Sequence, residues 1–206
     1  MLRKKLHLYY ANQLREEWKK EGHVAIVQGS RVLSVGMGDI GSTFLRKMKA
    51  LGAVTVGIKR TAGEKPPYVD ELYTAEALER ELPLADIVAL SLPGNNETRG
   101  IMNERRLGLM KKTAVLLNVG RGSAVDMEAL FKCLSMGKIA GAALDVTDPE
   151  PLPPGHPLWE APSLLLTPHT AGGYNHMEAT LERIKAIFLD NLRRYVEGRT
   201  LRNQVR

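Results

Sequence analysis

Short apolar runs alternate with helix-forming segments along most of this chain. The runs are rich in β-branched residues and show little alternation of apolar and polar positions, which is typical of strands covered on both faces. From the amino end they are Arg31–Val35, Val54–Ile58, Asp86–Leu90, Ala114–Val119, Ala140–Val146 and Leu164–Thr167. Strands that alternate with helices form parallel sheets with right-handed crossovers. The pattern therefore predicts an α/β domain built on a doubly wound parallel sheet.

The segments between and around these runs have the features of helices. Asn103, Asp126 and Thr74 each stand directly before such a segment and are suitable N-cap residues. The predicted helices are His7–Lys20, Thr43–Leu51, Ala75–Glu81, Glu104–Met110, Met127–Met136 and Met177–Glu197. We therefore expect three parts, namely an amino-terminal helical arm at 1–28, the sheet domain at 29–175, and a long carboxyl-terminal helix with its tail at 176–206.

A glycine-rich turn follows the first predicted strand. Gly36, Gly38 and Gly41 form the pattern Gly-x-Gly-x-x-Gly, with Asp39 and Ile40 between the last two. In such a turn the first glycine permits a tight bend, the second lets the backbone approach a pyrophosphate, and the third lets the helix pack closely on the strand. The amino terminus of the helix then attracts the phosphates. Because strand, turn and helix occur in this order, the pattern predicts a dinucleotide-binding Rossmann fold.

The end of the second predicted strand indicates which dinucleotide is bound. About 20 residues after the glycine turn, an NAD site usually has an acidic residue that bonds the ribose hydroxyls. This chain has Lys59 and Arg60 there instead. A carboxylate would repel a 2′-phosphate, whereas these two cations could pair with one. We therefore expect NADP(H) to be preferred and NAD(H) to remain possible, although both side chains could also be ordinary exposed charges.

Composition restricts the other functional classes. The chain has 29 basic and 23 acidic residues and a net charge of +6, a balance that can indicate nucleic-acid binding. The basic residues are scattered, so we expect a solvated surface and no nucleic-acid partner. No apolar run approaches the roughly 20 residues that a membrane helix needs. With no secretory signal and with a single cysteine, Cys133, in an apolar helical stretch, the sequence predicts a cytoplasmic location and no membrane association.

Three further segments begin where predicted strands end. They are Leu117–Gly122, Ala143–Leu152 and Leu166–Gly173. They contain Arg121, Glu150 and His169, each of which, taken singly, could be a loop residue with an ordinary surface partner. In an open parallel sheet, ligands bind outside the carboxyl ends of the strands. We therefore expect all three segments to face the same crevice as the glycine turn.

Together with the glycine turn, these segments resemble the D-isomer-specific 2-hydroxyacid dehydrogenases, a family that includes phosphoglycerate dehydrogenase and the glyoxylate/hydroxypyruvate reductases. The resemblance runs from about residue 7 to the end of the chain. Further ordered matches are Asn12–Trp18, Leu109–Lys111, His156–Trp159 and Leu201–Val205. A formate dehydrogenase is disfavoured, because that subgroup pairs its histidine with glutamine and this chain has Glu150.

The resemblance implies a role for each matching residue. Arg121 would hold the substrate carboxylate and polarise the ketone, and His169 would exchange a proton with the substrate oxygen. Glu150 would bond the other ring nitrogen of His169, fix its orientation and favour the imidazolium. Asp145 would hold the nicotinamide carboxamide. The resemblance thus implies a catalytic set of Arg121, Glu150 and His169 acting on small 2-ketoacids or 2-hydroxyacids, and we assign no metal site.

The chain departs from the family pattern at several places. Thr147 stands where the family usually has phenylalanine, and Gly94–Asn96 replaces a more usual sequence after Pro93. We assign Pro93 and Thr98, on either side of this change, to the cofactor site. The family also has a substrate-binding domain before the first helix, which the printed sequence does not contain. We therefore expect cofactor binding to be retained and turnover of glyoxylate or hydroxypyruvate to be very slow or absent.

Two interpretations of the function remain open. The first is an NAD(P)-dependent 2-ketoacid reductase, and the second is a non-catalytic dinucleotide-binding module, either a truncated product or a corepressor-like regulator. The resemblance also implies a homodimer formed through the cofactor domain. The residues of the arm that would make this contact are Leu8, Tyr9, Tyr10, Leu14 and Trp18, although the same residues could belong to an intramolecular core helix.

Overall fold

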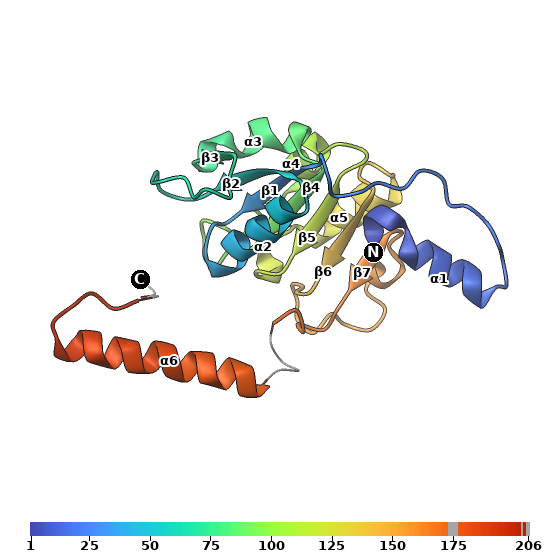
Figure 1. Cartoon of the computed structure of the whole chain (residues 1–206). Helices are drawn as coiled ribbons and strands as arrows, with labels where there is room; N and C mark the ends of the chain where they lie inside the picture. The colour runs from blue at the N-terminus through green and yellow to red at the C-terminus, as the bar shows by residue number, and fades with distance from the viewer. Residues whose placement is uncertain (173–176, 203, 205–206) are drawn as a thin grey trace. The chain divides into compact units, whose positions relative to one another are not determined.

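The computed structural model describes residues 1–172, 177–202 and 204. The chain divides into two compact units, Met1–His169 and Thr170–Arg206. The strands of the first unit are β1 (Arg31–Val35), β2 (Val54–Ile58), β3 (Glu71–Tyr73), β4 (Ile87–Leu90), β5 (Val115–Asn118), β6 (Gly141–Leu144) and β7 (Leu164–Leu166). They form one seven-stranded sheet in the order β3-β2-β1-β4-β5-β6-β7, with every neighbouring pair parallel (Figure 1). The predicted doubly wound fold is confirmed.

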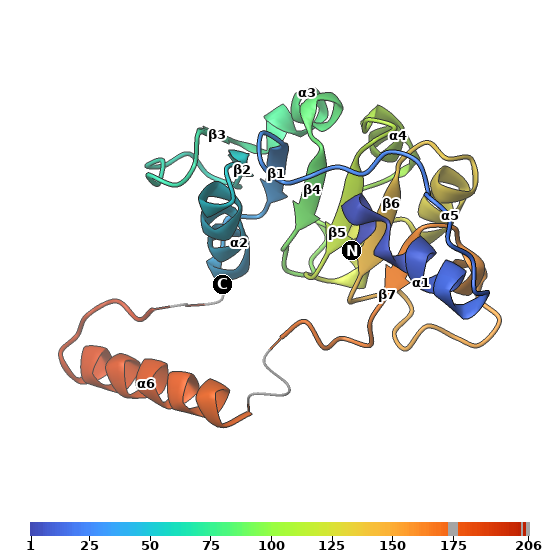
Figure 2. The ribbon, with the colours of Figure 1, turned by 45° about the vertical axis from the view of Figure 1, so that its right-hand side comes forward.

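Helices cover both faces of this sheet. The α-helices are α1 (Leu6–Leu14), α2 (Asp39–Ala50), α3 (Leu78–Glu81), α4 (Glu104–Leu109) and α5 (Met127–Ser135). Short 3-10 turns are η1 (Leu2–Lys4), η2 (Ala75–Ala77), η3 (Leu82–Leu84), η4 (Gly122–Ala124) and η5 (Pro157–Glu160). Figures 1 and 2 show α2 on one face and α3, α4 and α5 on the other. This is the arrangement that right-handed crossovers produce when the strand order reverses between β1 and β4.

The core has two parts because alternate residues of each strand point to opposite faces. In β1, Val32 belongs to a cluster with Leu45 of α2, whereas Leu33 belongs to a larger cluster with Leu78 of α3. All four of these side chains are at most 2% exposed. Burying each of them contributes about 1.5–3 kcal/mol. The sheet is therefore buried on both faces, which explains why its strands read as continuous apolar runs.

The structure differs from the sequence prediction at several elements. Strand β3 was not predicted, because it has three half-buried residues, Glu71–Tyr73, at the edge of the sheet. The first helix was predicted to reach Lys20 and ends at Leu14, after which Glu16 has a positive φ of 58°. Helix α2 begins at Asp39, four residues before the predicted start, because the glycine turn passes directly into the helix. The six predicted strands each contain an observed strand.

Two of the three predicted N-caps are made by the side chain. Asn103 accepts a hydrogen bond from the Arg106 amide, and Asp126 accepts one from the Ala129 amide, each at 3.0 Å. Thr74 occupies the N-cap position of η2 but makes no such bond, since its hydroxyl donates to the Glu76 carboxylate instead. The segment at 75–81 accordingly begins as a 3-10 turn rather than as a regular α-helix.

Arg31 links three elements at the amino end of the sheet. Its guanidinium makes two hydrogen bonds to Glu71, at 2.8 and 2.6 Å, and one to Glu81 at 2.6 Å. The Glu81 side chain is only 3% exposed. Arg31, followed by the Tyr73 hydroxyl, holds the pKa of Glu71 at about 2. The ionised form of Glu71 therefore stabilises the fold above its ordinary pKa, and this contribution is lost as the pH falls towards 2.

We expect Arg31→Met to lower the free energy of unfolding by about 2 kcal/mol at pH 7, because it removes the guanidinium that pairs with Glu71 and with the buried Glu81. Urea unfolding measures this difference. Because the folded pKa of Glu71 is depressed, the difference between the two proteins should shrink as the pH falls from about 4.5 to about 2. A difference that is the same at pH 7 and pH 3 would contradict the assignment to this ion pair.

The second unit contains the long helix α6 (Met177–Val196), which confirms the predicted carboxyl-terminal helix. The predicted domain boundary at 175/176 and the matched residues Asn203 and Val205 lie outside the described residues. The three predicted domain ranges stay predictions.

Within the described part of the chain, no helix is both long enough and apolar enough to cross a membrane. Cys133 is 4% exposed, and burial raises the pKa of its thiol.

Candidate active site

The glycine turn joins β1 to α2 and has the geometry that the motif predicts. Gly36 has a φ of 103°, a value that favours glycine. A Cβ on Gly41 would lie 2.0 Å from the Gly36 carbonyl oxygen, so the helix packs against the turn too closely for any side chain. A Cβ on Gly38 would meet nothing within 4 Å. The backbone at Gly38 is therefore open to an approaching group.

The start of α2 suits a phosphate. Asp39 and Ile40 occupy its first turn and are exposed. Gly38 is the N-cap residue, and among the described residues no side chain caps the helix there. The first amides of an α-helix have no partner within the helix. These amides, the dipole of a 12-residue helix and the open space at Gly38 together form a site that fits a pyrophosphate.

The end of β2 lies directly beside this turn. The Gly36 amide donates to the carbonyl of Ile58 at 2.9 Å, and Lys59 and Arg60 follow Ile58. The Lys59 amide donates to the Tyr73 carbonyl of β3 at 3.1 Å, which fixes the backbone of this strand end. The Arg60 side chain is 80% exposed. Both predicted phosphate-binding cations thus stand at the strand end that neighbours the glycine turn.

On the other side of β1, the loop after β4 also contacts the turn. The Ser91 hydroxyl donates to the Gly36 carbonyl at 3.2 Å. Further along, the Thr98 hydroxyl donates to the Pro93 carbonyl at 2.6 Å and closes the loop on itself. Pro93 is exposed and Thr98 is half-buried. The loop that contains the unusual Gly94–Asn96 sequence is therefore held by its own hydrogen bonds.

The loop after β5 carries Arg121 and is held by Asn118. Asn118 is fully buried, and its side-chain nitrogen Nδ2 donates to the Arg121 carbonyl at 2.9 Å. Its side-chain oxygen Oδ1 accepts a hydrogen bond from the Gly120 backbone amide at 3.1 Å. A Cβ on Gly94 would lie 3.2 Å from the Arg121 side chain, so the loops after β4 and β5 are adjacent. The Arg121 guanidinium donates to the Gly120 carbonyl at 2.8 Å. Asn118 is a positioning residue that the sequence prediction missed.

The loop after β6 is locked to the loop after β5. A Cβ on Gly122 would lie 1.9 Å from the Thr147 carbonyl oxygen, so the two backbones are in direct contact. The Thr147 amide donates to Glu150 at 3.4 Å, and its hydroxyl donates to the Pro149 carbonyl at 2.8 Å. The bond to Glu150 comes from the backbone, and only the hydroxyl bond to the Pro149 carbonyl is one that the usual phenylalanine could not make.

Glu150 and His169 meet across the ends of β6 and β7. Glu150 Oε1 lies 2.6 Å from His169 Nδ1, and the two side chains are 40% and 51% exposed. The His169 backbone has a φ of 55°, and its amide donates to the carbonyls of Asp145 and Thr167 at 2.9 and 3.0 Å. Asp145 is 6% exposed and accepts a 2.5 Å hydrogen bond from the Thr167 hydroxyl.

A cavity of about 390 Å³ lies beside this pair. Its wall includes Asp145, Glu150, His169 and the indole of Trp159. The Trp159 ring nitrogen donates to the Pro153 carbonyl at 2.8 Å. Among the described residues, no hydrogen bond or ion pair joins Arg121 to Glu150 or His169, and no cluster of His, Cys, Asp and Glu could hold a metal ion. The strand-end loops thus place a carboxylate–imidazole pair and a separate guanidinium at the edge that carries the glycine turn.

Comparison with known proteins gives the same family along most of the chain. The family model described as D-isomer specific 2-hydroxyacid dehydrogenase, NAD binding domain, matches residues 1–171. A glyoxylate reductase of Korarchaeum cryptofilum is 35% identical over 190 residues, which cover 88% of this chain and 55% of that protein. This chain therefore spans about half the length of that relative.

Comparison with solved structures gives the same family. A D-isomer specific 2-hydroxyacid dehydrogenase from Xanthobacter autotrophicus, in complex with NADPH, is 32% identical with a TM-score of 0.84, and the match covers 98% of this chain and 81% of that one. An NADPH-dependent glyoxylate/hydroxypyruvate reductase from Sinorhizobium meliloti, in complex with NADP and sulfate, is 28% identical with a TM-score of 0.84 and coverages of 99% and 64%. This chain belongs to the D-isomer specific 2-hydroxyacid dehydrogenase family and contains the NAD-binding domain of that family.

Proposed function

We propose that this chain is the cofactor-binding and proton-transferring part of an NAD(P)-dependent enzyme that reduces small 2-ketoacids to D-2-hydroxyacids. The 2.6 Å contact between Glu150 and His169, at the sheet edge that carries the glycine turn, is the observation that carries the proposal. The names of the relatives, glyoxylate reductase and glyoxylate/hydroxypyruvate reductase, support a substrate of two or three carbons.

Within this proposal, His169 holds and moves the proton. Its Nδ1 donates to Glu150, which leaves Nε2 to carry the proton that passes to the substrate carbonyl oxygen. The carboxylate fixes the orientation of the ring and stabilises the charged imidazolium before transfer. When bound, the reduced nicotinamide supplies the hydride.

Two further residues would orient the reactants. Arg121 would hold the substrate carboxylate, because a guanidinium offers two parallel N–H donors to a carboxylate. Asp145, which is buried and held by Thr167, would bond the nicotinamide carboxamide. The Asn118 side chain holds the backbone carbonyl of Arg121, and the Thr147 backbone amide bonds the Glu150 carboxylate. Neither Asn118 nor Thr147 therefore needs to touch a ligand.

The exposure of the pair sets an expected level of activity. His169 and Glu150 are 51% and 40% exposed, and electrostatic stabilisation of a transition state weakens where water has access. We therefore expect this chain alone to bind the dinucleotide and to reduce glyoxylate or hydroxypyruvate slowly. Nucleotide binding followed by fluorescence, together with NADPH consumption in the presence of each ketoacid, tests this. Binding without any turnover would favour a non-catalytic dinucleotide-binding module instead.

The cofactor preference forms part of the proposal. Lys59 and Arg60 stand where an NAD site would have a carboxylate, so NADPH should bind about tenfold more tightly than NADH. Titration of the protein with each nucleotide measures the ratio. The double variant with Lys59→Ala and Arg60→Ala should lose the preference while keeping its affinity for NADH. Tighter binding of NADH to the unchanged protein would contradict the preference.

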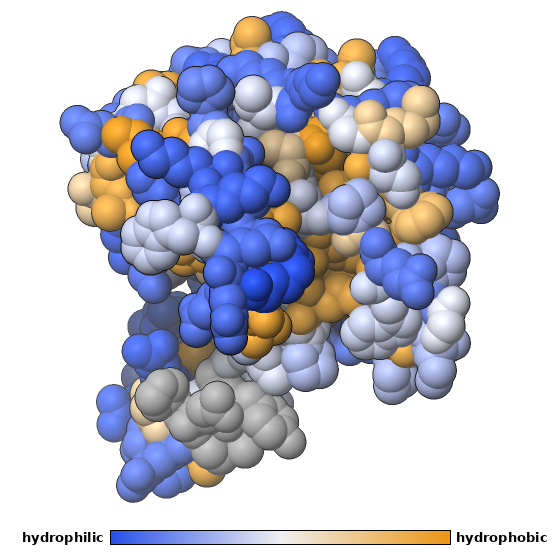
Figure 3. Space-filling model, turned by 90° about the vertical axis from the view of Figure 1, so that its right-hand side faces the viewer, coloured by the Kyte–Doolittle hydropathy of each residue, from blue (hydrophilic) through white to orange (hydrophobic). Residues whose placement is uncertain are grey.

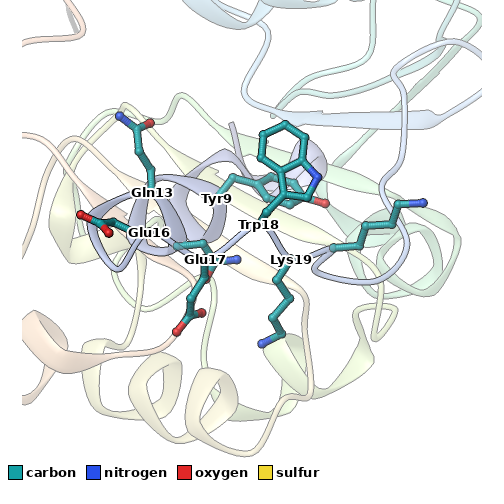
Figure 4. Close-up of a pocket in the computed structure, with 8 residues that line it drawn as sticks. Tyr9, Gln13, Glu16, Glu17, Trp18 and Lys19 are labelled. Carbon is teal, nitrogen blue, oxygen red and sulfur yellow. The ribbon is translucent and has the colours of Figure 1, made fainter.

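The arm at residues 1–28 supports a homodimer. Trp18, Tyr10 and Leu14 are each more than 60% exposed, and Figure 3 shows apolar surface in a hollow on the side of the molecule that carries the arm. In Figure 4, Tyr9 and Trp18 line one pocket, and the carboxylates of Glu16 and Glu17 point away from them. Aromatic side chains of this kind commonly anchor protein interfaces. Sedimentation should show a dimer, and a monomer at all concentrations would remove this part of the proposal.

A cytoplasmic location also stays a prediction.

A further inference from the structure

A charged contact crosses the carboxyl end of β1. Arg60 Nη1 lies 4.0 Å from Glu97 Oε2, and the two side chains are 80% and 72% exposed. Arg60 comes two residues after β2, and Glu97 lies in the loop after β4. Because β2 and β4 flank β1 in the sheet, this contact spans the strand end from which the glycine turn begins.

The backbone around Glu97 is held in place by the residue that follows it. The Thr98 hydroxyl donates to the Pro93 carbonyl at 2.6 Å, and the Thr98 amide donates to the Asn95 side chain at 3.0 Å. The Asn95 amide donates to the Thr98 hydroxyl at 3.2 Å. These bonds fold residues 93–98 into a compact turn. The carboxylate of Glu97 is therefore presented towards Arg60 by an ordered loop.

We propose that Glu97 is a specificity-determining residue that weakens the binding of dinucleotides with a 2′-phosphate. This inference rests on the proposed function, in which Lys59 and Arg60 receive that phosphate. A phosphate that bonds Arg60 competes with the Glu97 carboxylate for the guanidinium and remains near that carboxylate. Both groups are negatively charged, so the carboxylate that pairs with Arg60 in this structure repels a phosphate that binds there.

Charge and distance set the size of the effect. An exposed ion pair such as Arg60–Glu97 contributes little free energy, so a phosphate can replace the carboxylate as the partner of Arg60. The repulsion between Glu97 and a phosphate of nearly two negative charges persists over about 10 Å at 0.1 M salt. We expect a two- to fivefold effect, roughly, on the affinity for NADPH at low ionic strength. NADH has only hydroxyls at this position and should be affected much less.

The test is Glu97→Gln, which keeps the shape of the side chain and removes its charge. Dissociation constants for NADPH and NADH are measured at low and at high salt. At low salt the variant should bind NADPH at least about twofold more tightly and NADH unchanged, and the gain should shrink at high salt. Glu128→Gln is the matched control, because Glu128 is 78% exposed and paired with Lys132 at 2.7 Å on α5. It makes the same change in net charge and should alter neither constant.

Arg60→Gln separates this inference from the proposed function. In the Arg60→Gln background, the residual effect of Glu97→Gln on NADPH should be smaller than in the parent protein. If Arg60→Gln weakens NADPH binding and Glu97→Gln leaves it unchanged, the role of Glu97 is wrong and the phosphate site stands. If Arg60→Gln also leaves NADPH binding unchanged, the proposed phosphate site itself is wrong. An equal gain for NADPH and NADH in Glu97→Gln would likewise overturn the role of Glu97.

Discussion

Gly41→Ala is expected to abolish dinucleotide binding and to lower the free energy of unfolding by about 3 kcal/mol or more. The added Cβ would lie 2.0 Å from the Gly36 carbonyl oxygen and 2.7 Å from the hydroxyls of Ser34 and Ser91. Both hydroxyls already donate to that carbonyl, at 2.9 and 3.2 Å. Neither the backbone nor these side chains can move without breaking the turn, so α2 must move away from β1.

Two other glycines provide controls for this experiment. Gly38→Ala introduces a Cβ that meets nothing within 4 Å, so the protein should fold normally but bind the dinucleotide more weakly. Gly108→Ala, within α4, has the same open space and should stabilise the protein by about 0.5–1 kcal/mol without changing binding. Urea unfolding and NADPH titration give both quantities. A Gly41→Ala protein that is as stable as the parent would contradict the close packing described for the turn.

Much of the fold could be predicted because the sheet is buried on both faces. A strand such as β1, with Leu33 at the larger core and Val32 at the smaller one, is apolar throughout and is easily recognised. Strand β3 has the opposite character, since Glu71 points to Arg31 and Tyr73 bonds Glu71. Its strand conformation depends on pairing with β2, which is a tertiary contact that three residues of sequence do not specify.

The candidate site could be predicted in outline for a similar reason. The carboxyl ends of parallel strands lie along one edge, so residues after β1, β2, β5, β6 and β7 had to lie along that edge. The exact contacts depend on loop conformation. The approach of Glu150 to His169 follows from the turn that Thr147 shapes and from the positive φ of His169, and neither can be read from residue type. Asn118 gave one usable signal, a polar residue at the end of an apolar strand.

His169→Asn is expected to lower the rate of glyoxylate reduction by about 10²–10⁴-fold, because it removes the group that transfers the proton. Asparagine is the suitable replacement, since His169 has a φ of 55° and asparagine adopts the left-handed region more readily than most residues. The amide contacts of His169 with Asp145 and Thr167 should therefore persist. NADPH consumption at high protein concentration measures the rate, and NADPH titration should give an unchanged dissociation constant.

Glu150→Gln separates the proton carrier from the residue that orients it. Glutamine can keep the 2.6 Å contact with His169 Nδ1 but cannot offset the charge of the imidazolium, so a smaller loss of about 10–10²-fold is expected. The double variant should be no slower than His169→Asn alone, because Glu150 acts only through the imidazole. Additive losses in the double variant would give Glu150 an independent role. A His169→Asn protein that reduces glyoxylate at the parent rate would remove His169 from the chemistry, and the chain would then be a dinucleotide binder whose carboxylate–imidazole pair serves the fold alone.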